Sequence, residues 1–335
     1  MEVHTDNIDV IIFSCDRALQ LEAVLHSFYL HCINANNANI YVLYLATDAR
    51  HDHQYKSLIA NYPGITFILQ KNFRQNLLTL TNPYKEISFR KFIYLAICLI
   101  GNMGCSKGSW LSYIWELTGG KAERGLIRTF LPALLDNKYI VFLVDDNIFV
   151  RDFNLRDCVV VLDKCRELLG FSLRLGENTT FCYPLNSPQE LPEFTKLCDD
   201  LVKFDWTNSE YDFGYPLEVS SSIFRIEEIV PFMMALRFNN PNTLEEQMAS
   251  HTSLFRSRFP YLGCFRRSVT FCNPINKVQT IIPNRAGEVV YYGIDELATR
   301  FEHGERIKVD AYNDFVPNGC HQEVEFIFER VNEKR

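Results

Sequence analysis

Residues 142–149 read Phe-Leu-Val-Asp-Asp-Asn-Ile-Phe, so three polar side chains come directly after an apolar run. The run from Tyr139 to Val144 predicts a buried strand, because strands that are covered on both faces are apolar throughout. In an open α/β sheet, ligands bind beyond the carboxyl ends of the strands. We therefore expect Asp145 and Asp146 to emerge where a ligand would bind.

The chain before this strand alternates between two periodicities. Apolar runs predict strands, and apolar residues at positions i, i+3 and i+4 predict amphipathic helices. In chain order the pattern gives a strand at 9–14, a helix around 21–29, a strand at 40–46, a helix around 55–61 and a strand at 65–69. Such alternation indicates a parallel sheet that is covered by helices.

The later part of the chain continues this alternation less regularly. Residues 87–137 are largely helical in pattern and are interrupted by glycines. Beyond the central apolar strand, the pattern predicts a helix at 157–169, strands at 171–175 and 217–224, and helices at 226–238 and 243–259. No internal repeat or linker-like tract separates these segments. We therefore expect one α/β domain over residues 1–260 and a C-terminal extension over residues 261–335 that packs on it.

The composition of the 335-residue chain limits the classes of function. With 47% apolar and 22% charged residues it is typical of a globular protein, which excludes collagen-like, low-complexity and mainly disordered proteins. Lys and Arg number 34 against 41 Asp and Glu, which gives a net charge of −7. That balance argues against a general nucleic-acid-binding surface, but it permits a local basic pocket for a small phosphorylated ligand.

The number and spacing of the cysteines and the lengths of the apolar runs indicate the cellular location of the protein. The 11 cysteines are odd in number and contain no C-x-x-C pair, so neither a disulfide framework nor a zinc clip is indicated. Reduced thiols fit a cytoplasmic protein. The first residues do not resemble a secretory signal, and the longest apolar run is far shorter than the roughly 20 residues that span a bilayer. We expect no transmembrane segment, while peripheral contact with a membrane stays open.

The glycine-rich motifs of other nucleotide-binding folds are missing. Gly101, Gly104 and Gly108 have the spacing G-x-x-G-x-x-x-G, which is neither the dinucleotide fingerprint nor the phosphate loop. Without such a loop, a nucleotide diphosphate needs another counter-charge, and a divalent cation held by carboxylates supplies one. Adjacent carboxylates such as Asp145 and Asp146 repel, and bound Mg²⁺ or Mn²⁺ relieves that repulsion. A solvated turn is the alternative.

Three stretches of the chain resemble nucleotide-sugar glycosyltransferases of the GT-A fold. They are residues 9–17, residues 46–48 (Ala-Thr-Asp) and residues 144–149 (Val-Asp-Asp-Asn-Ile-Phe). The last is particularly similar to the family 2 type of bacterial polysaccharide and spore-coat transferases, and the resemblance covers roughly residues 8–260. It implies a Rossmann-like, mostly parallel sheet flanked by helices, and transfer of a sugar from a nucleotide-sugar donor to a glycan or related hydroxyl acceptor.

The resemblance also implies roles for residues on the donor side. Asp16 and Asp48 would border the base and the ribose, and Asp145 would contact the nucleotide. Ser14 and Arg17 would belong to the same donor site, where Arg17 could pair with a phosphate or merely be exposed. Asp16 and Asp48 could each instead be a helix N-cap, since Asp before an amphipathic helix is a common cap. The family's usual Gly-Ser after the second strand is missing, so the base of the nucleotide stays unresolved.

By the same resemblance, Asp146 would bind the metal, Mn²⁺ or Mg²⁺. Asn147 departs from the commoner D-x-D pattern, which leaves the ligand open between these two positions. His321 lies in a polar turn, and a neutral imidazole there could complete the coordination, as a C-terminal histidine does in some GT-A enzymes. A histidine that is simply exposed in a loop is the alternative.

The segment after Pro241 contains the candidate catalytic base. Thr243 and Glu246 match the S/T-x-x-E capping box, which gives Glu246 a structural task at the start of a helix. Glu245 has no such task, and its place resembles that of the general base of inverting GT-A enzymes, which removes the proton of the acceptor hydroxyl. If Asn242 is the cap instead, the pairing moves to Glu245 and the catalytic assignment weakens.

Two further features have open alternatives. Arg174 alternates with apolar residues in the strand predicted at 171–175, so it could bind a diphosphate in the cleft or form a structural ion pair with a buried acid. An aromatic cluster in an acidic segment could stack on a sugar acceptor or pack as a hydrophobic lid. Its members are Trp206, Tyr211, Phe213 and Tyr215.

Together these residues predict a metal-dependent, inverting glycosyltransferase. Two alternatives belong to other classes. A non-catalytic module of the same fold would bind a nucleotide sugar or a glycan without turnover. A phosphotransferase with an aspartyl nucleophile at a strand end normally has a second Asp two residues after the first, and Asn147 occupies that position.

Overall fold

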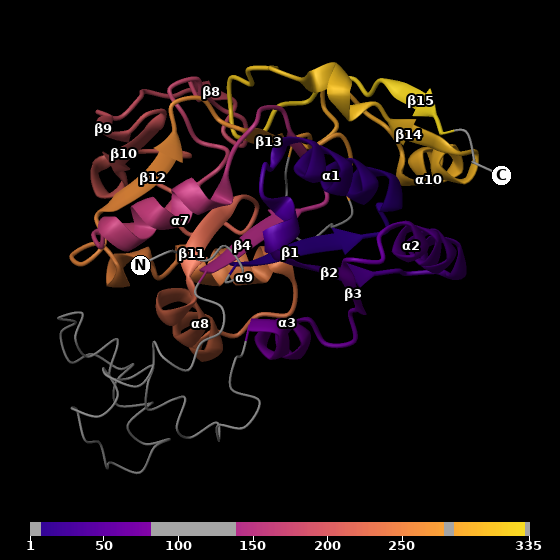
Figure 1. The fold of residues 1–335 in the computed structure, drawn as a ribbon, viewed down its shortest axis with the longest axis horizontal. Coiled ribbons are helices and arrows are strands. Elements are labelled where there is room, and N and C mark those ends of the chain that lie inside the picture. The colour runs from indigo at the N-terminus through magenta and orange to yellow at the C-terminus, as the bar shows by residue number, and fades with distance from the viewer. Residues whose placement is uncertain (1–7, 82–138, 278–284, 332–335) are drawn as a thin grey trace, which may run out of the picture.

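The computed structural model describes residues 8–81, 139–277 and 285–331. A nine-stranded sheet lies at its centre, with the strand order β3-β2-β1-β4-β11-β6-β12-β10-β9 (Figure 1). Its strands are β1 (Ile8–Cys15), β2 (Asn39–Leu45), β3 (Thr66–Leu69), β4 (Tyr139–Val144), β6 (Leu168–Ser172), β9 (Thr195–Cys198), β10 (Leu201–Asp205), β11 (Ser222–Arg225) and β12 (Tyr261–Phe265).

Seven of these nine strands point the same way. β1 is parallel to β2 and β4, β2 to β3, and β6 to β12. β11 runs against its neighbours β4 and β6, and β10 runs against β12 and β9. The mostly parallel α/β sheet that the sequence predicts is therefore confirmed. Because β11 is reversed, its first residue, Ser222, lies at the edge where β4 and β6 end.

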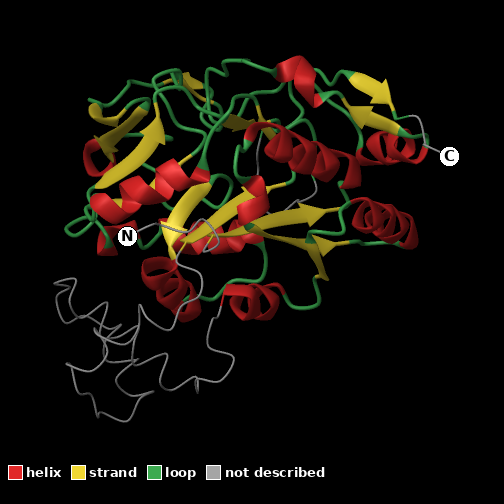
Figure 2. Cartoon of the chain, viewed as in Figure 1, coloured by secondary structure: helices red, strands yellow, loops and turns green. Residues whose placement is uncertain are grey.

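Helices cover both faces of this sheet (Figure 2). They are α1 (Ala18–His31), α2 (Ala49–Asn61), α3 (Phe73–Thr81), α7 (Leu155–Lys164), α8 (Ile226–Ala235), α9 (Pro241–Ala249) and α10 (Ile294–Glu302). Smaller strand pairs join β5 (Asn147–Phe149) with β13 (Thr270–Cys272), β7 (Phe181–Cys182) with β8 (Ser187–Pro188), and β14 (Glu305–Ile307) with β15 (Phe328–Arg330). Short 3₁₀ turns occur at Ala35–Asn37, Trp206–Asn208, Thr252–Leu254 and Val309–Tyr312.

The side chains of β1 explain why the sheet has a helical layer on each side. Ile8, Val10 and Ile12 belong to one core, with residues of α1, α2, α7 and α10. Ile11 and Phe13 belong to a second core, with residues of α3, α8 and α9. Successive side chains of a strand point to opposite faces, so an unbroken apolar run is buried on both.

One predicted helix ends earlier than its pattern suggests. The helix expected at 157–169 is shorter, because α7 ends and β6 begins within that range. The buried side chain of Arg225 closes this helix end by donating to the carbonyl groups of Leu162 and Cys165, and it also donates to that of Leu168 at the start of β6. Such carbonyl groups at a helix end have no partner within the helix. The periodicity of apolar residues alone does not show that a buried arginine ends the helix here.

Other predicted elements also change length. The strand expected at 217–224 is confined to β11, and the helix expected at 243–259 is confined to α9 and a separate 3₁₀ turn. Tyr261, where we expected the extension to begin, is the first residue of β12 in the central sheet. The helical pattern at 87–137 lies outside the described residues.

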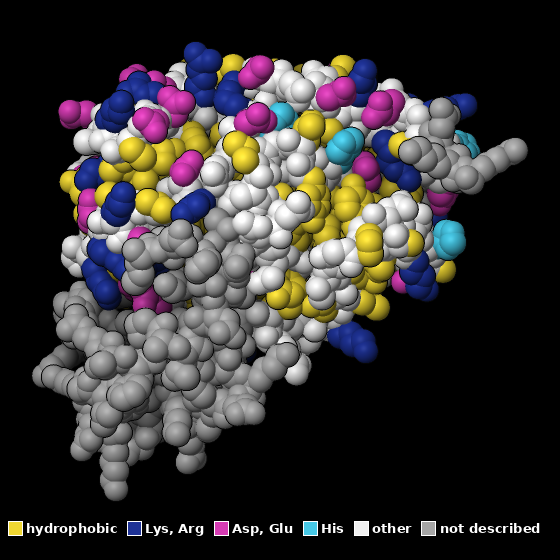
Figure 3. Space-filling view, viewed as in Figure 1, with side chains coloured by type: hydrophobic (Ala, Val, Ile, Leu, Met, Phe, Trp, Pro, Cys, Tyr) yellow, Lys and Arg dark blue, Asp and Glu magenta, His cyan; other side chains and the backbone are white. Residues whose placement is uncertain are grey.

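Three general properties of the described residues are the mixture of charges on one face, the state of the cysteines and the character of the helices. On the face drawn in Figure 3, Lys and Arg side chains are interspersed with Asp and Glu side chains. The nine cysteines within the described ranges are free, and six of them are buried, where a thiol packs as a small apolar side chain. In the same ranges, no helix has the length and apolarity needed to cross a membrane.

Gly263 in β12 leaves room for the ring of Phe171 in β6. A Cβ atom at position 263 would lie 2.6 Å from Cδ2 of Phe171, which is closer than carbon atoms pack. We expect Gly263→Ala to lower the free energy of unfolding by about 1–3 kcal/mol, because added volume in a packed core displaces side chains from their rotamers. Urea-induced unfolding followed by fluorescence measures the loss. Gly64→Ala is the control, since no atom lies within 4 Å of its Cβ position. An equal loss in both variants would contradict the explanation.

Candidate functional site

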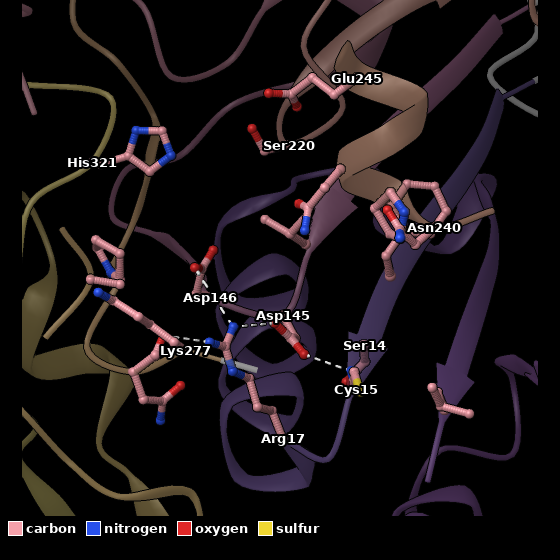
Figure 4. Close-up of a pocket in the computed structure, with 18 of the residues that line it drawn as sticks. Ser14, Cys15, Arg17, Asp145, Asp146, Ser220, Asn240, Glu245, Lys277 and His321 are labelled. Atoms are coloured by element: carbon pink, nitrogen blue, oxygen red, sulfur yellow. Dashed lines mark hydrogen bonds and ion pairs between the residues drawn. The ribbon is translucent and has the colours of Figure 1, made fainter. Parts of the chain in front are cut away.

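A cavity of about 580 Å³ opens at the edge where β1 and β4 end. Its walls come from the ends of β1, β2 and β4, the turn before β11, the start of α9, and segments around positions 183, 276 and 321. Ligands of open α/β sheets bind at this edge. Figure 4 shows the side chains that meet there. The predicted residues that line the cavity are Ser14, Arg17, Asp145, Asp146, Glu245 and His321.

Arg17 forms an ion pair with the first of the two adjacent acids. Its Nη1 lies 3.0 Å from Oδ1 of Asp145 and 3.9 Å from Oδ2 of Asp146. Oδ2 of Asp145 accepts the backbone N–H of Cys15 at 3.0 Å. Nη2 of Arg17 donates to the carbonyl group of Asn276 at 2.6 Å. The side chains of Arg17 and Asp145 are only 8% and 6% exposed, so the exposed alternative for Arg17 is wrong.

Asp146 faces the cavity, whereas Asn147 does not. Oδ1 of Asp146 is buried and has no hydrogen-bond partner among the described residues. The buried amide of Asn147 accepts the backbone N–H of Val144 at 2.9 Å and donates to Sγ of Cys272 at 3.5 Å. Of the two positions that the sequence leaves open for a metal ligand, Asp146 is the one with an available oxygen.

The environment of Asp146 fits a divalent cation. Burial raises the pKa of Asp146, Arg17 opposes the rise, and Asp145 adds to it. Carboxylate oxygens are the ligands that Mg²⁺ and Mn²⁺ prefer, and Mg²⁺ sites often combine one or two carboxylates with substrate phosphates. In the part of the chain that the structure describes, no group of three or more His, Cys, Asp or Glu side chains could hold a metal ion. An ion at Asp146 would therefore take further ligands from a bound phosphate and from water.

His321 lies in the cavity wall beside Arg174. Nη1 of Arg174 is 3.3 Å from Nε2 of His321, and because a guanidinium only donates, Nε2 accepts. Burial, with Arg174 as a second cause, lowers the pKa of His321 to about 3, so the imidazole is neutral at pH 7. In this arrangement Nδ1 carries the proton and is buried without a partner. His321 can thus donate to a ligand, and it would coordinate a metal through Nε2 only after losing its contact with Arg174.

Helix α9 begins earlier than the capping motif predicts. Pro241 is its first residue and Asn240 is its N-cap. The Asn240 side chain accepts the N–H of Thr243 at 2.8 Å, and the Thr243 hydroxyl oxygen accepts the N–H of Asn240 at 3.1 Å. The predicted box of Thr243 with Glu246 is wrong, and so is the alternative cap at Asn242. Proline is favoured at the first helical position because its missing N–H is not needed there.

Glu245 takes no part in this cap and lines the cavity (Figure 4). Its Oε2 accepts the backbone N–H of Val219 at 3.0 Å, and the nearby hydroxyl of Tyr215 lowers its pKa. Burial raises the pKa of Glu245, Arg174 opposes the rise, and Glu218 adds to it. A carboxylate with a raised pKa in a cavity suits proton abstraction near neutral pH.

Glu218 is a second buried acid near the cavity, and the sequence analysis missed it. Its carboxylate accepts the backbone N–H and the hydroxyl of both Ser220 and Ser221, and the hydroxyl of Ser222. Nη2 of Arg174 lies 3.5 Å from its Oε2. Burial alone would raise the pKa of Glu218, but Arg174 and the serine donors lower it. For Arg174, the alternative of a structural ion pair with a buried acid is therefore the one observed.

Asp16 joins two loops and does not cap a helix. Its carboxylate accepts the N–H of Thr47 at 2.8 Å and the hydroxyl of Thr47 at 2.7 Å. Its φ of 56° lies in the left-handed region, which Asp tolerates better than most residues. The N-cap of α1 is Arg17, without a side-chain hydrogen bond, so the capping alternative for Asp16 is wrong. Asp16 is outside the cavity lining, and its contact with a donor stays a prediction.

Asp48 and Ser14 differ in their relation to the cavity. Asp48 caps α2, where it accepts the N–H of His51 at 2.9 Å, and it is outside the cavity lining. Ser14 lines the cavity, and its hydroxyl lies 2.6 Å from the hydroxyl of Tyr55. Ser14 is therefore within reach of a ligand in this cavity, while a donor contact of Asp48 stays a prediction.

Two cationic residues of the cavity wall were not predicted. Lys277 and Arg285 line the side formed by the C-terminal part of the chain. Arg285 donates to the carbonyl group of Tyr183 at 2.8 Å, and its guanidinium carbon lies 5.0 Å from the centre of that ring. With Arg17, these residues place three cations on the cavity, which suits a ligand with phosphate groups. The weak periodicity of the C-terminal sequence gives no signal that would bring them beside β4.

The four members of the aromatic cluster differ in burial, and neither predicted role is tested by this difference. Trp206 and Phe213 are buried, and the ring of Phe213 packs against Phe204 with 5.1 Å between centres. Tyr211 and Tyr215 are 41% and 36% exposed. The first two residues therefore form part of the core, whereas the two tyrosines are open to solvent.

The sequence is similar to a known glycosyltransferase. No protein-family model matches the chain. The bifunctional glycosyltransferase pgtA of Dictyostelium discoideum is 21% identical over 306 residues, which covers 83% of this chain and 33% of that protein. The chain thus spans about a third of the length of the curated relative that it matches. The match confirms the predicted resemblance to glycosyltransferases.

Solved structures overlap with this chain loosely. The crystal structure of S. aureus TarS 1-349 is 11% identical and has a TM-score of 0.39, covering 79% of this chain and 60% of that chain. Mouse xyloside xylosyltransferase 1 in its apo form is 10% identical and has a TM-score of 0.31, covering 82% of this chain and all of that chain. Overlaps of this size assign neither a fold nor an activity.

The pairing of Arg17 with the buried Asp145 and the mostly buried Asp146 gives a pH-dependent prediction. We expect Arg17→Met to lower the free energy of unfolding by about 3–5 kcal/mol at pH 8, because it leaves Asp145 and Asp146 buried without their cation. The pKa of Asp146 is already raised, and loss of Arg17 raises it further. A raised pKa in the folded state means that folding disfavours the ionised form of the acid, which lowers the free energy of unfolding at high pH. This loss disappears as the pH falls through the raised pKa, because the acid is then protonated. The difference from the wild type should therefore shrink toward pH 4.

Urea-induced unfolding at pH 8 and pH 4 measures this difference. Arg266→Met is the matched control, because Arg266 and Glu177 form an ion pair whose side chains are 45% and 40% exposed. We expect this control to lose less than about 1 kcal/mol. A loss in Arg17→Met that is the same at both pH values would contradict the electrostatic explanation.

Proposed function

We propose that this chain is a metal-dependent glycosyltransferase that moves a sugar from a nucleotide-sugar donor to a hydroxyl of a glycan or related acceptor, with inversion at the anomeric carbon. One observation carries the proposal: Asp146, with an unpartnered oxygen, and Glu245, with a raised pKa, line the same cavity. The match to a glycosyltransferase supports the class of reaction.

The end of the cavity at β1 and β4 suits the diphosphate of the donor. Arg17 and Lys277 supply positive charge near this end, and Arg285, which is paired with Glu288, lines the same cavity. Asp145 is fixed beside them by its contacts with Arg17 and with the backbone of Cys15. A divalent ion held by Asp146 would neutralise phosphate charge and stabilise the departing diphosphate. Nδ1 of His321, in the same cavity wall, has no hydrogen-bond partner within the described ranges and would be available to donate to the donor substrate.

Glu245 accepts the proton of the acceptor hydroxyl in the proposed step. As the proton moves to the carboxylate, the hydroxyl oxygen bonds to the anomeric carbon, and the bond from that carbon to the diphosphate oxygen breaks. Its electron pair leaves with the nucleoside diphosphate, and attack opposite the leaving group inverts the configuration. Glu218 does not suit this role, because serine donors and Arg174 already occupy its oxygens.

The proposed base gives the first functional prediction. We expect Glu245→Gln to lower kcat by roughly 10²–10⁴-fold, the usual contribution of general-base catalysis, because an amide cannot take the proton. Transfer and donor hydrolysis are assayed over a panel of nucleotide sugars, with donor affinity from calorimetry, which should change little. Glu246→Gln, in the exposed neighbour of Glu245, is the control. Wild-type turnover by an Asp146→Ala, Glu245→Gln double variant would eliminate the mechanism, and donor binding without any turnover would identify a binding module.

The proposed metal ligand gives a second functional prediction. We expect EDTA to stop transfer by the wild type and Mn²⁺ or Mg²⁺ to restore it. Asp146→Asn should lower activity at least about 10-fold at fixed metal concentration, because loss of the anionic ligand weakens metal binding. Thermal shifts by nucleoside diphosphates with and without Mn²⁺ provide a binding readout. Asp295→Asn, in a side chain that is 93% exposed, is the control. Transfer that EDTA leaves unchanged would refute metal dependence.

A further inference from the structure

The carboxylate of Glu218 organises the turn that leads into β11. Glu218 is 3% exposed and accepts hydrogen bonds from Ser220, Ser221 and Ser222. Arg174 supplies the counter-charge, 3.5 Å away. A buried carboxylate is costly unless its oxygens are fully paired, and apart from Arg174 its partners here lie within the next four residues. These bonds hold the backbone of the turn in one conformation.

This turn is also the part of the chain that contacts the proposed base. The backbone N–H of Val219, which lies inside the turn, donates to Oε2 of Glu245 at 3.0 Å. Ser220 lines the cavity near Glu245, as Figure 4 shows. The position of the Glu245 carboxylate therefore depends on a backbone group that Glu218 holds in place.

Tyr215 is a second group that acts on Glu245, since its hydroxyl lowers the pKa of that carboxyl. Burial and the nearby carboxylate raise the pKa of Tyr215, so its hydroxyl is protonated and able to donate. The Tyr215 side chain is partly exposed, in contrast to the buried ring of Phe213 two residues earlier. Its hydroxyl contact therefore links an otherwise accessible side chain to the proposed base.

We propose that Glu218 and Tyr215 are positioning residues for Glu245: Tyr215 donates directly to its carboxylate, and Glu218 holds the turn whose Val219 N–H donates to it. This inference rests on the proposed function, in which Glu245 is the base. Two donors on one carboxylate fix its rotamer and leave the remaining lone pairs for the acceptor hydroxyl. A misplacement of about 1 Å can cost roughly 100-fold in rate.

The two positioning residues also affect the basicity of Glu245 in opposite directions. The ionisable groups that act on Glu245 are Arg174, Glu218 and Tyr215. The negative charge of Glu218 raises the pKa of Glu245, whereas the Tyr215 hydroxyl stabilises the carboxylate and lowers its pKa. Removing either contact should therefore shift the titration of the base, with a different sign in each case.

The test is the pH profile of kcat for Tyr215→Phe and Glu218→Gln, with saturating donor and acceptor. The acidic limb, which reports protonation of the base, should move to higher pH in Tyr215→Phe and to lower pH in Glu218→Gln, each by roughly one pH unit. The maximal kcat should fall about 10- to 100-fold in both. Glu228→Gln is the matched control, because Glu228 is also buried and paired with an arginine, Arg258 at 3.2 Å, but lies outside the cavity. Its profile should coincide with that of the wild type.

The outcomes separate the two levels of the argument. Suppose that Glu245→Gln is inactive, but that the acidic limbs of Tyr215→Phe and Glu218→Gln coincide with that of the wild type or move in the same direction. The positioning roles are then wrong, while the proposed base stands. If Glu245→Gln transfers at the wild-type rate, the proposed function itself fails. Calorimetry of donor binding checks that each variant is folded. Tyr215→Phe keeps its partly exposed ring, so it tests the inference even if Glu218→Gln does not fold.

Discussion

Two adjacent carboxylates at the end of a buried strand repel each other, and here the guanidinium of Arg17 places an opposite charge beside both. Arg17 reaches Asp145 and Asp146 from the turn that follows β1, and the N–H of Cys15 in β1 supplies Asp145 with its other partner. Removing one member of a buried ion pair leaves an uncompensated charge. The loop after β1 and the end of β4 therefore depend on each other. Two hydrogen bonds from Thr47 to the Asp16 carboxylate also join the loop after β2 to the loop after β1.

Much of this arrangement could be predicted from the sequence, because it follows from local patterns. Apolar runs locate β1, β2, β3 and β4, and the run in β4 is almost unbroken because that strand is covered on both faces. The acids that follow β4 emerge at the edge where ligands bind, as the run before Asp145 indicates. Glu245 lines the cavity as expected, but the reason given for it was wrong. Pro241 at the first helical position made Asn240 the cap, and this left Glu245 free in a way that the S/T-x-x-E pattern did not describe.

The remaining parts could not be predicted, because they depend on which residues meet across the chain. Alternation with apolar neighbours predicts that Arg174 is in a strand at 171–175, but β6 ends at Ser172 and Arg174 follows it, and the pattern does not say that Glu218 is its partner. The reversal of β11 brings the turn before Ser222 to the edge where the parallel strands end, and a strand pattern carries no information on direction. Arg285 is held in the cavity wall by donating to the carbonyl group of Tyr183, which lies about one hundred residues earlier in the chain. Periodicity reports burial, whereas partners follow from topology.

The carbonyl group of Asn276 that receives Arg17 lies 259 residues further along the polypeptide. During synthesis on the ribosome, β1 emerges long before this acceptor exists. In a nascent chain that has not reached Asn276, the guanidinium of Arg17 therefore lacks this hydrogen bond. The cavity wall formed by the C-terminal part of the chain is absent as well. Contacts between such distant residues also close slowly, because the intervening chain must lose entropy first. A product that ended between β12 and Asn276 would consequently contain all nine strands of the central sheet but lack one wall of the cavity, which is complete only once the chain extends beyond that wall.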